Sequence, residues 1–147
     1  MDAYGLLPEA IKPPYTKLTA YDLNNGTIKW QIGLGDDYRV VNAGGPHCTG
    51  AAQLSQKNSA IITSTGLVIV TAPDRKIHFY DADSGNELFT TPVGANSTGS
   101  PSMYELNGKQ YLLITAADVG MRGGALDPSA DPNLKGPKGL IAIALKQ

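Results

Sequence analysis

The sequence is bounded first by what it lacks. Cys48 is its only cysteine, so no disulfide can form within the chain and no cysteine cluster can bind a metal. No apolar run approaches the ~20 residues that cross a bilayer. The net charge is −1 at pH 7, which excludes a basic surface for nucleic acid. No segment has a helical period, so an α-rich fold is also excluded.

The N-terminus, residues 1–5, is acidic and lacks the apolar stretch of a signal peptide. We therefore expect either a cytoplasmic protein or a piece of a longer protein. The 147 residues are enough for one hydrophobic core. They include 17 glycines and 10 prolines, a turn-rich composition that suits many short strands.

The chain contains an internal repeat. An Asp, a Gly and an aromatic residue recur at equal offsets, first as Asp22, Gly26 and Trp30 and then as Asp81, Gly85 and Phe89. Residues 140–145 align with residues 18–23 and form a third copy of the repeat, which is incomplete. The copies lie 59 and 63 positions apart, counted from Asp22 to Asp81 and from Asp81 to Ala144. A period near 60 indicates a repeat architecture, and the incomplete third copy favours a piece of a longer protein.

Alternating and β-branched residues predict nine strands in groups of two, four and three. We expect them at residues 15–23, 27–32, 59–63, 66–71, 75–81, 87–91, 100–106, 109–116 and 139–145. Four antiparallel strands form one blade of a β-propeller. We therefore expect an all-β partial propeller of two to three blades, in which residues 1–147 form a single domain. Residues 15–32 would form half a blade, 59–91 a full blade and 100–145 a three-stranded last blade.

Two long segments, residues 33–58 and 117–138, interrupt the short turns. One connects two blades and the other connects the second and third strands of the last blade. In a propeller both kinds of connection fall on the same face. Loops of this length usually carry function, so we expect any site on that face.

The repeat resembles the tryptophan-docking motif of quinoprotein dehydrogenases, which depend on pyrroloquinoline quinone (PQQ). The residues that match the motif are Ala20, Asp22, Gly26 and Trp30, followed by Asp81 and Gly85 in the second copy. Residues 63–68, 74–76 and 104–111 are similar, in the expected order, to the C-terminal part of membrane-bound glucose dehydrogenase-like members. The similarity covers the chain from about Pro13 onward, outside the two long segments.

The resemblance implies an eight-bladed parent protein that binds PQQ and calcium and oxidises a sugar or an alcohol in the periplasm. Its remaining blades, or further copies of this chain, would be the partners. In this family most cofactor contacts and the calcium ligands come from earlier blades. The isolated chain is therefore expected to bind neither cofactor and to be inactive. The alternatives are a non-catalytic propeller that serves as a protein-binding scaffold, and a remnant that completes a ring only by self-association.

The motif has a structural reason. The glycine allows positive φ in the turn, the Asp carboxylate accepts turn amides and the aromatic ring fills the seam between blades. Phe89 departs from the pattern, which prefers Trp there. We still expect Trp30 and Phe89 to be buried in corresponding seams.

Candidate cofactor contacts lie in the two long segments. Arg122, beside Gly123 and Gly124, could bind a PQQ carboxylate, since a guanidinium suits bidentate recognition of that group. Asn42 and His47 could face the quinone or the substrate, although a solvated glycine-rich loop is the favoured interpretation for them. No set of metal ligands is identified, because the acidic residues near 127–133 do not match a calcium loop. No catalytic group is identified either.

Overall fold

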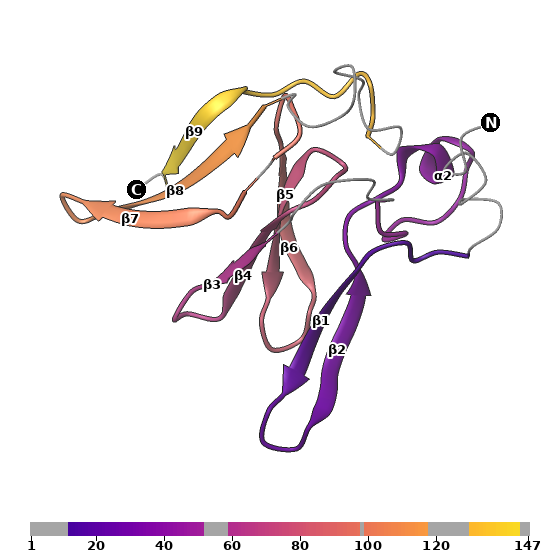
Figure 1. Ribbon diagram of the computed structural model, residues 1–147, viewed down its shortest axis with the longest axis horizontal. Helices are drawn as coiled ribbons and strands as arrows, with labels where there is room; N and C mark the ends of the chain where they lie inside the picture. The colour runs from indigo at the N-terminus through magenta and orange to yellow at the C-terminus, as the bar shows by residue number, and fades with distance from the viewer. Residues whose placement is uncertain (1–11, 52–58, 98, 118–129, 145–147) are drawn as a thin grey trace.

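The computed structural model describes residues 12–51, 59–97, 99–117 and 130–144, and regular structure in these residues is almost all β (Figure 1). Three antiparallel sheets follow one another along the chain, with two, four and three strands. Their strands are β1 (Lys17–Asp22) and β2 (Thr27–Gly33), then β3 (Ala60–Ile62), β4 (Leu67–Thr71), β5 (Lys76–Asp81) and β6 (Glu87–Pro92), then β7 (Ser102–Leu106), β8 (Lys109–Ala116) and β9 (Gly139–Ala144). The all-β prediction is confirmed, and every strand boundary lies within about two residues of its predicted place.

Local chemistry explains why the strands turn where they do. Gly26, Gly85 and Gly108 have φ of 67°, 75° and 73°, the left-handed region in which a side chain is strained. Asn107, the residue before Gly108, also has positive φ, which gives the expected Asn-Gly hairpin between β7 and β8. The short connections therefore follow directly from sequence.

Two apolar layers hold the three sheets together. The first joins the second and third sheets, through Ile69 and Ile77 on one side and Leu112 and Ile114 on the other. The second layer joins the first and second sheets, where Leu18 and Ile32 pack against a cluster that includes Val68, Val70 and Tyr80. The second sheet therefore has both faces covered. In Figure 1 it lies between the β1–β2 hairpin and the β7–β8–β9 sheet.

The segment 33–58, predicted as loop, contains a short helix among its described residues. The helix, α2 (Tyr38–Asn42), is capped by Asp37, whose carboxylate accepts the amide of Arg39 and also binds the Arg39 guanidinium. The Asp37 residue is fully buried, and its own amide donates to Thr49 Oγ1 at 2.8 Å. Five residues are too few to show a helical period, so only the cap could have signalled this helix.

The same segment folds back onto the first hairpin. A Cβ at Gly50, where φ is +67°, would lie 2.2 Å from the carbonyl oxygen of Thr16. Thr16 Oγ1 in turn donates to the carbonyl of Ala51 at 2.9 Å. These contacts fix the path of the segment toward the second sheet. No helix in the described part of the chain has the length and apolarity that a membrane span requires.

Candidate functional site

Trp30 joins the first and second sheets. Its indole Nε1–H donates to the carbonyl oxygen of Ala82 at 3.0 Å, and its residue is partly buried. The ring lies directly on the turn of the next sheet, since a Cβ at Gly85 would come within 2.7 Å of Trp30 Cδ2. Gly85 is thus required for two reasons, its positive φ and the space that the indole occupies. Sequence reasoning found only the first.

The two aspartates of the repeat stabilise their turns in the way that the motif predicts. Asp22 Oδ1 accepts the amide of Asn24 at 2.9 Å, and Asp81 Oδ1 accepts the amide of Ser84 at 2.7 Å. These hydrogen bonds lower the pKa of both carboxyl groups, chiefly through the Asn24 amide at Asp22 and the Ser84 hydroxyl at Asp81. The contacts in both turns therefore favour the ionised form of the aspartate.

The expected burial of Phe89 is wrong. Its residue is 61% exposed, and its ring contacts Phe79 of its own sheet at a centroid distance of 5.7 Å. The reason is the lack of a receiving turn within the described residues. Asp81 aligns with Ala144, and the positions that correspond to Ala82 onward begin at 145, outside the described part of the chain.

Residues of both long segments line one pocket of about 480 Å³, which agrees with their expected placement on one face. The pocket lies between α2, the β4–β5 turn and the segment before β9. Three of its lining side chains are carboxylates and one is an ammonium group. The lining residues are Asp36, Tyr38, Val41, Asn42, His47, Asp74, Lys76, Asp131 and Leu134.

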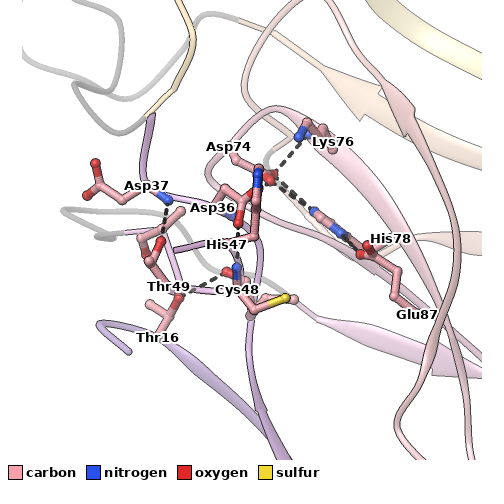
Figure 2. Close-up of polar contacts among 12 residues, drawn as sticks. Thr16, Asp36, Asp37, His47, Cys48, Thr49, Asp74, Lys76, His78 and Glu87 are labelled. Carbon is pink, nitrogen blue, oxygen red and sulfur yellow. Dashed lines mark hydrogen bonds and ion pairs between the residues drawn. The ribbon is translucent and has the colours of Figure 1, made fainter. Parts of the chain in front are cut away.

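Asp36 organises one wall of the pocket (Figure 2). Its Oδ2 lies 2.8 Å from His47 Nδ1, and its Oδ1 accepts the amide of Cys48 at 2.6 Å. The Asp36 amide donates to Asp74 Oδ2 at 3.2 Å. Cys48 has φ of 57°, so the chain reverses sharply beside His47. The wall is therefore a polar unit that is anchored to the second sheet through Asp74.

Behind Asp74 lies a buried histidine between two carboxylates. The His78 side chain is 4% exposed, and its Nε2 lies 3.1 Å from each Asp74 oxygen. Its Nδ1 lies 2.6 Å from Glu87 Oε1. Burial alone would lower the pKa of His78, but its hydrogen bonds and the charges of Asp74 and Glu87 outweigh burial and raise it. Figure 2 shows the three side chains in a row that leads away from the pocket.

Two further groups near this row are held in their neutral forms. Burial, followed by the charge of Glu87, raises the pKa of Tyr80, whose ring stacks on His78 at 5.8 Å. Cys48 is exposed, yet partial loss of hydration at its sulfur and the charge of Asp36 raise the pKa of its thiol. Cys48 is thus a poor nucleophile at neutral pH.

The structure brings some of the sequence candidates together. Asn42 and His47 line the pocket, whereas Arg122, Gly123 and Gly124 lie outside the described residues. Sequence reasoning missed Asp36, Asp74 and His78. Asp74 lies two residues before β5 and His78 is the third residue of β5, so an aspartate and a histidine only four positions apart were the available signal.

The comparisons with known proteins agree on one family. Residues 4–112 match the PQQ family described as glucose/ethanol/alcohol dehydrogenase, beta-propeller domain. The glycerol dehydrogenase large subunit of Gluconobacter oxydans is 31% identical over 112 residues, which cover 71% of this chain and 14% of that protein. The quinoprotein glucose dehydrogenase of Escherichia coli is 27% identical over 124 residues, covering 76% of this chain and 14% of its own length.

A solved structure shows the same fold. The quinohemoprotein alcohol dehydrogenase of Comamonas testosteroni superposes with a TM-score of 0.59 at 20% identity, covering 87% of this chain and 16% of that one. The three sheets are thus a partial β-propeller, and the chain spans only about a seventh of the length of the relatives described above. On this evidence the chain belongs to the PQQ-dependent glucose/ethanol/alcohol dehydrogenase β-propeller family.

Proposed function

We propose that this chain forms the C-terminal blades of a periplasmic PQQ-dependent dehydrogenase that oxidises a sugar or an alcohol. The observation that carries the proposal is the family match over residues 4–112, together with coverage of only 14% of each of two relatives. The chain would be one partial-propeller domain of an eight-bladed ring. Its strands supply blade structure, and its two long segments border the mouth of the quinone site.

The described pocket does not suit PQQ itself. PQQ carries three carboxyl groups and, when bound, accepts two electrons from the substrate. The pocket presents the carboxylates of Asp36, Asp74 and Asp131, against the single ammonium of Lys76. Like charges at this density oppose an anionic ligand. We therefore propose that Asn42 and His47 lie at the rim of the quinone-binding mouth. Arg122, Gly123 and Gly124 remain the proposed quinone contacts.

Calcium is not assigned to the described residues either. Both Asp74 oxygens already face hydrogen-bond donors, namely the amides of Asp36 and Lys76 and the ring of His78. No group of three His, Cys, Asp or Glu side chains in the described ranges has a geometry that could hold a metal ion. We propose that the calcium ligands belong to other blades of the parent protein.

The third sheet offers the surface for those other blades. The face turned away from the second sheet is apolar, with Tyr104 stacked on Tyr111 at 5.0 Å. Leu106 and Leu140 extend this face and are 55% and 69% exposed. On β1 and β2, by contrast, the side chains of Thr19 and Gln31 hydrogen-bond to each other. We propose that another blade, or a second copy of the chain, covers the apolar face.

Isothermal titration of the purified chain with PQQ and Ca²⁺ tests the proposal. Two to three blades leave a ligand open to water, so we expect binding too weak to measure at micromolar concentration and no dye reduction with glucose or ethanol. Arg122→Ala and Lys76→Ala are the matched variants. Stoichiometric micromolar binding would contradict the proposal. Loss of that binding in Arg122→Ala would place the quinone on the 117–138 segment, whereas loss in Lys76→Ala would place it in the acidic pocket.

A further inference from the structure

The Asp74–His78–Glu87 row holds a proton that nothing in the proposed function uses. Both ring nitrogens of His78 face carboxylate oxygens, at 3.1 Å and 2.6 Å. A neutral imidazole has only one N–H, so one of its nitrogens would direct a lone pair at a carboxylate. Both nitrogens can donate only in the imidazolium, which is the form that two ionised carboxylates favour. The geometry therefore describes a buried cation between two anions, and the raised pKa of His78 agrees with it.

This cation is linked to the wall of the pocket by a continuous chain of hydrogen bonds. His78 contacts both oxygens of Asp74, and Asp74 accepts the Asp36 amide at 3.2 Å. The Asp36 carboxylate then holds the Cys48 amide and the His47 ring. At the other end, Glu87 belongs to β6, the outer strand of the second sheet. One proton on His78 thus connects β6 to the segment that contains residues 36–48.

We propose that His78 is a positioning residue for the pocket: its protonated ring holds Asp74, and through Asp74 the wall of residues 36–48, and loss of the ring proton releases that wall.

The groups around His78 are arranged so that loss of its ring proton would affect the wall of residues 36–48. Glu87 faces the ring from β6, Asp74 from the β4–β5 turn, and Tyr80 from β5 itself, where it is held neutral. Lys76 begins β5 and lines the pocket, and the Cys48 thiol on the facing segment is held protonated. The ring is therefore the cation that contacts both carboxylates in the described part of the chain. A neutral ring has one N–H left, and the shorter contact, to Glu87, keeps it. Asp74 then loses the ring as a donor and retains only the amides of Asp36 and Lys76.

Solution NMR of the full chain between pH 5 and pH 9 tests the proposal. The ring ¹⁵N signals of His78 report protonation, and the Asp36 amide reports the bond to Asp74. We expect the Asp36 amide to shift with the midpoint of His78. We also expect its hydrogen exchange, corrected for the intrinsic effect of pH, to accelerate by about tenfold or more above that midpoint, as loss of a charge-assisted hydrogen bond implies.

Two variants separate positioning from simple packing. His78→Arg places a permanent cation between the same carboxylates, so the Asp36 amide should stay protected and insensitive to pH across the range. His47→Gln removes the exposed histidine on the same wall, and the response at the His78 midpoint should persist. If His78→Arg does not fold, the titration of the unmodified protein still decides. The proposal is overturned if the Asp36 amide ignores the His78 titration, or if its response disappears in His47→Gln.

Discussion

Trp30 and Phe89 occupy the same position in two copies of one repeat, yet their surroundings differ. Trp30 is partly buried against the next sheet, donates to Ala82 and rests on Gly85. Phe89 is 61% exposed and contacts only its own sheet among the ring contacts of the described residues. Phenylalanine also has no N–H to donate. The repeat therefore specifies where an aromatic ring is placed, whereas the receiving turn decides whether that ring is buried.

The glycines of the two turns show the same contrast from the other side. Nothing lies within 4 Å of a Cβ built on Gly26, whereas the indole of Trp30 fills the space at Gly85. Both glycines have positive φ, so their local role is identical. In an extended propeller, the turn at Gly26 would receive an aromatic ring of a preceding blade. Substituting the two glycines, and then the two aromatic residues, tests this contrast.

The largest effect is expected from the glycines. Gly85→Ala should destabilise the protein by roughly 2–4 kcal/mol, because a left-handed alanine is strained and its methyl group also displaces the indole. Gly26→Ala is the matched control, since it has the strain alone, and should cost about 1–2 kcal/mol. Urea unfolding of both variants measures the difference. Equal losses would mean that Trp30 does not pack on Gly85 in solution.

The aromatic residues should give the next effect. Trp30→Ala removes a partly buried ring and its hydrogen bond, so we expect a loss of about 2–3 kcal/mol, below the cost of a fully buried Trp. Phe89→Ala removes an exposed ring and should cost less than about 1 kcal/mol. Thermal unfolding of the two variants compares them directly. A Phe89→Ala loss as large as that of Trp30→Ala would show that another surface covers Phe89, and dilution of the sample would then reveal whether a second copy supplies it.

The contrast also shows what sequence can specify. The nine strands, their turns and the Trp30 contact follow from short-range patterns, namely alternation, turn residues and equal offsets in the repeat. The exposure of Phe89 could not be read in this way, because it depends on whether a turn of another sheet packs on the ring, and none does so among the described residues. A glycine that must be small, such as Gly85, is indistinguishable in sequence from one that needs only positive φ.

The hydrogen-bond network beside the pocket was even harder to predict from the sequence. Glu87 meets His78 because the β5–β6 register shifts between Phe79 and Tyr80, and a bulge of this kind leaves no clear mark in the residues. Asp36 reaches Asp74 across 38 positions, which only the folded segment brings together. The sequence did direct attention to the segment that lines the pocket, since it singled out Asn42 and His47.

Dependence on pH sharpens the comparison between the two repeats. Asp22 and Asp81 have lowered pKa values in the folded state, so their stabilisation is present above 3.8 and is lost as pH falls through the lowered values. The raised pKa of His78 acts in the opposite direction: its stabilisation is complete below 6.5 and is lost as pH rises through the raised value. Stability should therefore be highest at about pH 5–6.

Thermal unfolding across pH 3–9 measures this profile, and three variants assign its two sides. Asp22→Asn and Asp81→Asn should each flatten part of the acid side, because each repeat has its own turn aspartate. His78→Arg should flatten the alkaline side alone, because only the second sheet carries the buried histidine. An alkaline slope that survives in His78→Arg would assign the loss of stability to another group.

The smallest effect is expected at the rim of the Trp30 seam, where Lys29 Nζ lies 2.6 Å from Asp83 Oδ1. This ion pair links the first and second sheets, as Trp30 does, but its side chains are 42% and 90% exposed. Water and salt screen exposed charges, so Asp83→Asn should cost no more than ~0.5 kcal/mol. The difference should disappear in 1 M NaCl, where the Debye length is about 3 Å. Glu105→Gln, which removes an exposed carboxylate on β7, is the control for net charge. If Asp83→Asn costs as much as Trp30→Ala, and still does so at high salt, charge rather than indole packing would be what joins the two sheets.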